Sequence, residues 1–427
     1  MYLERNITGA SICSFLAKIS STLPMLVAIP LAISIYGPRL AGSWITINSL
    51  GVFLSFCCQS GNRSLTVEIN KYVNSIDNLS VKKSISSCYF LALILGIIQA
   101  LILLFVNNML DYELIFGLTK LELSELRYLS ILLIFYYAFL PFLSIGSDVR
   151  LAVNESHLAS TWQIFGNLIN IFGIWLMASP GSRMIFFVMA TFAGTCIAHL
   201  LNNFFLFRKR HGISPTIRHV SLNSIKTLLG SGFCYFYLAT VAMLNTCSNN
   251  VIITWAIGVD QVIWYEIGFR LFTMAMFMSY VFQPLWSVID GAIGCDEYTA
   301  LRKMFFAGVV KTLLASIGFA VLLIMFGNDI IALWAGKQVH MERVMFIAFG
   351  IWYVSTNVSM FVGAFLEHEK SIKFVMITIS ITTLVSLVAK TLACAYCGLA
   401  PMIAIGGITQ LVFCLIPYCI YLWRKLL

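Results

Sequence analysis

Four cationic side chains lie inside long apolar segments of the sequence: Lys18, Arg270, Lys311 and Lys390. A Lys or Arg at the centre of a membrane helix costs about 2.5–3.5 kcal/mol on insertion scales, so such residues commonly serve a function. Both side chains bind phosphate through charge-assisted hydrogen bonds. Lys18 and Arg270 lie deep in their segments, where they either face a water-filled cavity or form a structural ion pair. Lys311 and Lys390 lie nearer the segment ends, where they either snorkel to the interface or line a pathway.

One acidic residue, Glu266, lies well inside an apolar segment. It precedes Arg270 by one helical turn, so the two can form an intrahelical ion pair. The other interpretation is that Glu266 couples a transport cycle to protons or ions. Four buried cations against one buried acid predict a positively charged cavity, which favours an anionic substrate.

A polar stripe follows the second apolar segment at steps of three, four and seven residues: Asn48, Ser55, Gln59 and Asn62. These steps place all four side chains on one helix face. Within a membrane such residues either join neighbouring helices by hydrogen bonds or contact a polar substrate. His199, in another apolar segment, is interpreted as a packing residue rather than a proton carrier.

The composition shows why these residues need a membrane explanation. The chain has 427 residues, of which 60% are hydrophobic and 11% charged, whereas soluble domains carry about 25% charged residues. This excludes a soluble enzyme, a secreted disulfide scaffold and a disordered chain. The 12 cysteines mostly lie in apolar segments, and the single CxxC, Cys394–Cys397, lacks the second half of a zinc site. We therefore expect no metal, no cofactor and no nucleic-acid partner.

Apolar segments long enough to cross a bilayer recur along the whole sequence. They predict an all-α polytopic membrane protein with about twelve spans, and the intervening segments are too short for an extramembrane catalytic domain. The predicted spans are 10–36, 41–62, 85–106, 127–147, 158–178, 184–207, 227–257, 263–288, 304–326, 344–366, 372–393 and 401–423.

The distribution of basic residues predicts the orientation and the division of the chain. With the N-terminus in the cytoplasm, 17 of the 27 Lys and Arg residues fall in cytoplasmic segments and six on the opposite side. The positive-inside rule thus places both termini in the cytoplasm. The basic segment that begins at Arg208 separates six spans from six. We predict an N-terminal lobe at 1–210, a cytoplasmic linker at 211–226 and a C-terminal lobe at 227–427.

Three short stretches carry a family resemblance. They are Tyr36–Trp44 (YGPRLAGSW), then Gly51 followed by Gln59–Asn62 (QSGN), and Pro284–Ser287 (PLWS) with Ala292 and Asp296. In this order, on a chain with twelve predicted spans, they resemble the Wzx-type polysaccharide flippases of the multidrug, oligosaccharidyl-lipid and polysaccharide exporter superfamily. The resemblance implies a V-shaped bundle of two six-helix lobes around a central cavity lined by spans 1, 2, 7 and 8.

The resemblance also implies a function and a set of partners. Such proteins carry a polyprenyl-diphosphate-linked oligosaccharide, typically an O-antigen repeat unit, from the cytoplasmic to the periplasmic leaflet. We therefore expect a non-enzymatic, alternating-access flippase in the bacterial inner membrane, surrounded by membrane lipids, whose partners are undecaprenyl-diphosphate-linked oligosaccharide and the polysaccharide polymerase machinery. Lys18 and Arg270 would hold the diphosphate, the polar stripe the sugar hydroxyls, and Glu266 would couple the cycle.

Two other functions remain open from the sequence. A cation-coupled multidrug exporter would need buried carboxylates, of which Glu266 is the candidate. A membrane polysaccharide polymerase or ligase would need a reactive site on a large external loop, and the longest candidate, 107–126, is short.

Overall fold

The computed structural model describes most of the chain as helices. The described residues are 2–58, 65–66, 68–69, 78–153, 155–179, 181–231, 233–274, 298–335, 340–366 and 371–425. Within these ranges, eight helical stretches are long and apolar enough to cross a membrane. The prediction of an all-α polytopic membrane protein is confirmed.

Wherever the structure describes them, the predicted spans fall on helices; the span predicted at 41–62 is described up to Cys58. For the span predicted at 263–288, the structure describes the residues up to Met274. The helices that contain the spans are α1 (Tyr2–Cys58), α3 (Asn78–Met109), α5 (Lys120–Ala152), α6 (Ser156–Met177), α7 (Met184–Lys209), α8 (Leu222–Ser231), α9 (Phe233–Ala256), α10 (Asp260–Met274), α13 (Tyr298–Trp334), α14 (Arg343–Ala364), α15 (Ile372–Cys397), and α16 (Leu399–Gln410) with α17 (Ile416–Lys425).

Shorter elements connect some of these helices. A five-residue helix, α4 (Tyr112–Phe116), lies between α3 and α5. Two single turns of 3-10 helix, η1 (His211–Ile213) and η2 (Ile217–His219), follow α7 in the predicted linker.

Helix α1 contains the first two predicted spans. Its 57 residues would extend about 85 Å as one straight helix, far more than the roughly 30 Å of a hydrocarbon core. Gly37 interrupts it with φ 79° and ψ 164°, a conformation that glycine adopts without a steric penalty. The break therefore falls between the spans predicted at 10–36 and 41–62.

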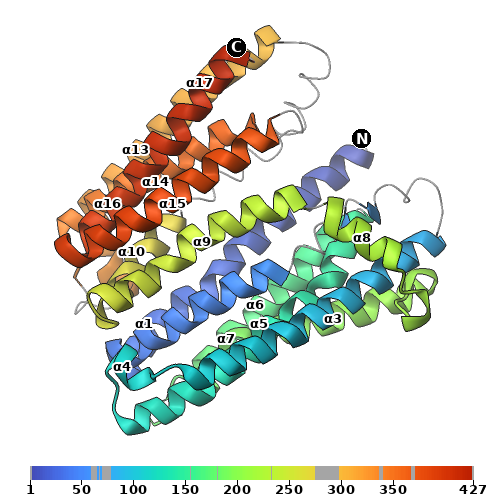
Figure 1. The fold of residues 1–427 in the computed structure, drawn as a ribbon, viewed down its shortest axis with the longest axis horizontal. Helices are drawn as coiled ribbons and strands as arrows, with labels where there is room; N and C mark the ends of the chain where they lie inside the picture. The colour runs from blue at the N-terminus through green and yellow to red at the C-terminus, as the bar shows by residue number, and fades with distance from the viewer. Residues whose placement is uncertain are drawn as a thin grey trace. The chain divides into compact units, whose positions relative to one another are not determined.

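The chain divides into two compact units, Met1–Thr240 and Val241–Leu427, and the boundary lies within α9. In the first unit, α6 packs most extensively on α7 and α1, and α5 packs on α1, α3 and α7 (Figure 1). The backbones of α6 and α7 come close at Gly166 and Gly194, because a Cβ atom on Gly194 would lie 2.3 Å from the Gly166 carbonyl oxygen. Small residues at helix contacts allow this kind of approach.

Asparagine side chains join helices of the first unit. Asn170 Oδ1 accepts a hydrogen bond from the Gly194 amide at 2.7 Å, and its Nδ2 donates to Thr195 Oγ1 at 2.9 Å. Asn167 Nδ2 donates to Ser20 Oγ on α1 at 3.0 Å. These polar residues of α6 thus hold neighbouring helices together.

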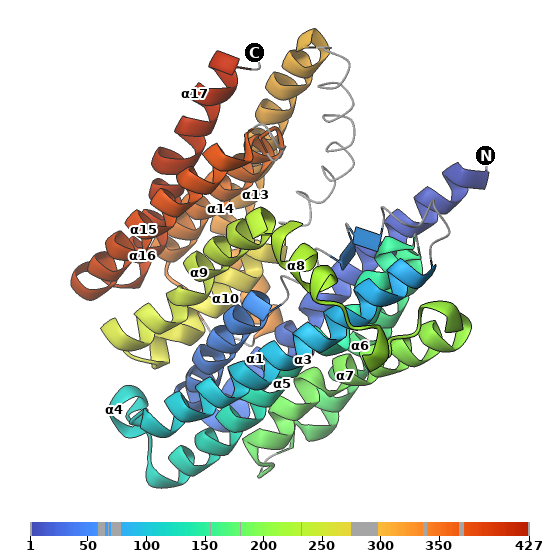
Figure 2. The same cartoon turned by 45° about the vertical axis from the view of Figure 1, so that its right-hand side comes forward.

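In the second unit, α14 packs on α13 and α16, and α15 packs on α16, as Figure 2 shows from a second direction. A π-helical turn, η3 (Leu411–Leu415), connects α16 to α17. Pro417 follows this turn closely. Proline lacks the amide hydrogen that would complete a regular helix here, so the wider turn accommodates the missing bond.

Candidate functional site

The centre of the second unit holds a buried lysine. Lys390, on α15, is 3% exposed. Its ammonium group donates three hydrogen bonds of 2.7 Å to α9: to the Asn245 carbonyl oxygen, to Asn245 Oδ1 and to Asn249 Oδ1. The side chain therefore crosses to the neighbouring helix instead of extending to the end of its own, which argues against snorkelling.

The same network continues to α10. Asn249 Nδ2 donates to Tyr265 Oη at 2.7 Å. One residue further along both helices, Asn250 Nδ2 donates to Glu266 Oε1 at 2.8 Å. Because Asn249 contacts both Lys390 and Tyr265, the network links α15, α9 and α10.

Glu266 and Arg270 form the intrahelical pair that their spacing predicts. Arg270 Nε lies 3.2 Å from Glu266 Oε2, and the exposed fractions of the two side chains are 25% and 6%. Arg270 therefore keeps part of its surface accessible while Glu266 is enclosed. The guanidinium also lies 6.0 Å from the centre of the Phe269 ring, within the range of a cation–π contact.

A cavity of about 410 Å³ opens beside Lys390, between α9, α10, α14, α15 and α16. Amide and hydroxyl groups share its surface with large aromatic rings. The lining residues with polar or aromatic side chains are Asn245, Thr246, Asn249, Tyr265, Phe269, Phe349, Trp352, Thr356, Thr383, Lys390 and Gln410.

The charge of this cavity depends on the groups that contact Lys390 and Arg270. Arg270 is paired with the carboxylate of Glu266, whereas the groups that hold Lys390 are neutral oxygen atoms. An ammonium in a buried site without a carboxylate partner produces a positive potential that attracts anions.

The other predicted cations lie on other helices. Lys311, on α13, is exposed among the exposed apolar side chains of Val310 and Leu314. Lys18, on the first segment of α1, is also exposed. Of the four predicted cations, Lys390 bonds directly to Asn249 of α9, and Arg270 is connected through Glu266 to the adjacent Asn250.

The polar stripe is described in part. Asn48 Oδ1 accepts a hydrogen bond from Tyr137 Oη on α5 at 2.8 Å. Ser55 is buried, and its hydroxyl has no hydrogen-bond partner among the described residues. Gln59 and Asn62 lie outside the described residues.

A second polar cavity, of about 470 Å³, lies in the first unit between α5, α6 and α7. Ser147 and His199 face each other there, with 3.4 Å between the hydroxyl oxygen and Nδ1. Asp148, Gln163 and Asn167 also line the cavity.

The sequence interpretation missed the three asparagines of α9. Asn245, Asn249 and Asn250 lie at helical spacing inside an apolar segment, the same signal that singled out the stripe from Asn48 to Asn62. These residues supply the described side-chain partners of Lys390, and one of them holds Glu266.

The fold is similar to that of solved membrane transporters. One match is an inward-facing multidrug resistance MATE family transporter of the MOP superfamily, with a TM-score of 0.79 and 15% identity over 96% of this chain and 98% of the other. An outward-facing transporter of the same description has a TM-score of 0.72 and 15% identity, over 98% of this chain and 95% of the other.

A third match is a MOP superfamily transporter from Pyrococcus furiosus Vc1 (DSM3638), described as having a binding pocket of reverse polarity that suggests a different function. It has a TM-score of 0.72 and 15% identity, over 98% of this chain and 95% of the other. No family model and no curated protein matches the sequence.

The chain therefore has the fold of the MATE-type transporters of the MOP superfamily. The predicted exporter-type fold is confirmed at this level, and the protein is a multi-pass membrane protein. The predicted assignment to the polysaccharide flippases is finer than this similarity of fold.

Proposed function

We propose that the protein is an alternating-access transporter that moves a lipid-linked, anionic oligosaccharide, such as a polyprenyl-diphosphate-linked O-antigen repeat unit, from the cytoplasmic to the periplasmic leaflet. The observation that carries the proposal is Lys390, a buried cation beside a cavity and held by neutral groups. A positively charged cavity selects against cationic drugs and for a phosphate-bearing substrate.

The lining of the cavity supports a sugar as part of the substrate. Asn245, Thr356 and Gln410 offer donors and acceptors of the kind that sugar hydroxyls need. The rings of Phe269 and Trp352 provide flat apolar surfaces beside them, and polar groups set among aromatic surface are typical of small-molecule sites.

In this proposal the residues singled out from the sequence bind different parts of the substrate. Lys18, Arg270, Lys311 and Lys390 supply positive charge along the route of the diphosphate, while Asn48, Ser55, Gln59 and Asn62 contact the sugar. The polyprenyl chain stays among the membrane lipids. No covalent step is needed, and the bacterial inner membrane, with a polysaccharide polymerase as partner, is the expected setting.

Glu266 is the proposed coupling residue. The carboxylate holds Arg270 at 3.2 Å, so its protonation would weaken the pair and release the guanidinium for an anionic substrate. An enclosed acid beside a partly accessible cation suits such an exchange.

The test is deletion of the gene followed by complementation. The parent gene should restore surface polysaccharide, while the deletion strain should accumulate the undecaprenyl-linked repeat unit on the cytoplasmic side. Lys390→Met should fail to restore the polysaccharide although the protein inserts normally. The matched control is Lys373→Met, an exposed lysine on the same helix, which should complement fully. Full complementation by Lys390→Met together with Arg270→Gln would refute these assignments.

A cation-coupled multidrug exporter is the second candidate, because matched structures include multidrug resistance transporters and Glu266 is buried at 4% exposure. The two candidates differ in a direct measurement. Efflux of a cationic dye such as ethidium that depends on Glu266, with unchanged surface polysaccharide in the deletion strain, would favour the multidrug exporter.

A further inference from the structure

The three hydrogen bonds of Lys390 limit how its ammonium group can act on a ligand. An ammonium has three hydrogens and no acceptor, and all three are directed at oxygen atoms of α9, two on Asn245 and one on Asn249. A substrate in the neighbouring cavity can pair with Lys390 only by displacing one of these bonds. The charge therefore acts on a ligand through the groups that Lys390 holds.

Lys390 determines the orientation of both carboxamides. Because an ammonium only donates, the atom that faces it on each asparagine must be Oδ1, so Nδ2 points away from it. In Asn249 this Nδ2 donates to Tyr265 Oη at 2.7 Å. In Asn245 the ammonium also holds the backbone oxygen of the same residue, so the carboxamide cannot turn over without losing a bond of 2.7 Å.

The Nδ2 atom of Asn245 is left for the cavity. It has no hydrogen-bond partner among the described residues, and it is not one of the enclosed atoms that lack a partner. Asn245 is half-buried and lines the cavity of about 410 Å³ beside Lys390. The side chain thus presents N–H donors to the cavity, while its acceptor Oδ1 is occupied.

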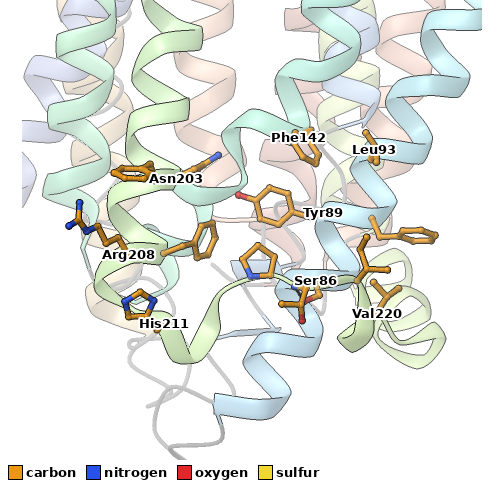
Figure 3. Close-up of a pocket in the computed structure, with 14 residues that line it drawn as sticks. Ser86, Tyr89, Leu93, Phe142, Asn203, Arg208, His211 and Val220 are labelled. Carbon is orange, nitrogen blue, oxygen red and sulfur yellow. Dashed lines mark hydrogen bonds between the residues drawn. The ribbon is translucent and has the colours of Figure 1, made fainter.

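A larger cavity in the first unit shows the contrast. It has a volume of about 790 Å³, lies between α3, α5, α7 and the segment of η1 and η2, and has a largely apolar lining (Figure 3). Its unpaired polar atoms, Tyr89 Oη and Asn203 Oδ1, are enclosed by the wall, so a molecule in that cavity cannot reach them. Asn245 Nδ2 is both unpaired and accessible.

The donors of Asn245 favour one class of ligand. The ammonium on the Oδ1 side polarises the amide and strengthens its N–H groups as donors. None of the described residues that line the cavity is acidic. An ionised phosphate oxygen only accepts hydrogen bonds, whereas a sugar hydroxyl both donates and accepts. A donor edge beside a buried cation therefore suits a phosphate oxygen better than a hydroxyl group or a cation.

We propose that Asn245 Nδ2 binds a phosphate oxygen of the substrate, and that Lys390 is the positioning residue that keeps the carboxamide in its donor orientation. This inference rests on the proposed function, in which the substrate carries a diphosphate. It leaves Thr356 and Gln410 of the same cavity for the sugar hydroxyls. Selectivity for the anion then depends on an uncharged residue whose direction is determined by a charged one.

The experiment measures the affinity of the detergent-purified full chain for farnesyl diphosphate, a short polyprenyl diphosphate, by isothermal titration calorimetry. The decisive variant is Asn245→Asp. Aspartate keeps both acceptors of Lys390 but has no side-chain N–H, so farnesyl diphosphate should bind at least about tenfold more weakly. The Tm should equal or exceed that of the parent, because the carboxylate gives the buried ammonium a charged partner.

Three controls separate the contact from general effects. Farnesol, which lacks the diphosphate, should bind equally to the parent and to Asn245→Asp. Asn245→Leu removes the amide without adding charge, so it should weaken farnesyl diphosphate binding and also lower the Tm, since Lys390 loses an acceptor. Asn223→Asp makes the same change at an exposed asparagine of α8 and should leave the Kd unchanged.

A double-mutant cycle tests the positioning role of Lys390. If Lys390 acts through Asn245, the losses of affinity in Lys390→Met and Asn245→Leu should not add in the double variant. Fully additive losses would show that the two residues act separately and would overturn this role.

The remaining outcomes distinguish this contact from the proposed function. Parent-like binding of farnesyl diphosphate by Asn245→Asp would remove Asn245 from the phosphate contact and leave the proposed function intact. Equal losses for farnesol and farnesyl diphosphate would also overturn the contact. A Tm of Asn245→Asp as low as that of Asn245→Leu would refute the orientation of the carboxamide. Absence of farnesyl diphosphate binding by the parent would overturn the anionic substrate and this contact together.

Discussion

Lys390 differs from the other cations of the predicted spans because neutral oxygen atoms hold its charge. Three acceptors from α9 satisfy all three ammonium hydrogens. Arg270 instead has a carboxylate one turn away. A protonated lysine surrounded by neutral dipoles keeps more of its external field than a cation in an ion pair, so Lys390 gives its cavity a positive potential when it carries the proton.

At the residue scale, Asn249→Ala should destabilise the second unit. The change removes an acceptor of Lys390 and the donor to Tyr265, and the buried groups left behind cost about 1–3 kcal/mol. Thermal unfolding in detergent should show a lower Tm. The comparison is Asn223→Ala on α8, where the side chain is exposed and the Tm should stay within error. Equal Tm values for the two variants would contradict the role of Asn249.

At the scale of elements, close backbone approach decides how α16 packs on α14. A Cβ atom on Gly407 would lie 2.6 Å from the Cα of Trp352, which is backbone and cannot turn away as a side chain can. Glycine at this position therefore sets the distance between the helices, in the way small residues do in membrane proteins.

Gly407→Ala should destabilise the protein by about 1–3 kcal/mol, the usual cost of overpacking. Gly318→Ala on α13 is the control, because a Cβ atom there meets open space and alanine favours helix. The Tm should fall for the first variant and stay equal or rise for the second. A fall of the same size in both would show that helix flexibility, and not packing, is responsible.

A charged cluster joins the ends of α5 and α7 in the first unit. Glu155, just before α6, accepts hydrogen bonds from Arg150 at 2.8 Å and from Arg210 at 2.9 Å, with Lys209 at 3.9 Å. Burial by itself would raise the pKa of Glu155, but the Arg210 hydrogen bond and the charges of Arg210, Arg150 and Lys209 outweigh it and lower the pKa below its ordinary 4.5.

This lowered pKa predicts an acid-dependent stability. Because the unfolded state takes up the proton more readily, the cluster stabilises the fold fully above pH 4.5, and the contribution is lost as the pH falls through the lower pKa of the folded state. Glu155→Gln should lower the Tm at neutral pH and reduce its decline between neutral and acidic pH. Parallel Tm-against-pH curves for the parent and the variant would contradict the prediction.

At the scale of the whole molecule, charge asymmetry predicts the orientation. The excess of Lys and Arg in alternate segments, 17 against six, places both ends in the cytoplasm. Green fluorescent protein fused after Leu427 should fluoresce, and alkaline phosphatase fused there should be inactive. Phosphatase fused within 178–184, between α6 and α7, should be active. Activity at the C-terminus would reverse the assignment of both termini.

The sequence by itself determined the class of the protein. A bilayer demands about 20 apolar residues for each crossing, and backbone polar groups must pair within the segment, so length and hydrophobicity suffice to locate helices. Charges such as Lys390 and Glu266 stand out for the same reason. The Glu266–Arg270 pair could also be predicted, because its geometry belongs to one helix.

Only the tertiary structure decided which groups meet. The position of a residue within its predicted span gives its depth in the membrane. It does not determine how the helix is rotated or which helices lie next to it. Lys390 could therefore be expected at a helix end, whereas the packing of α15 on its neighbours directs it into Asn245 and Asn249. The cavities follow from the same packing, since each combines residues from helices far apart in the chain.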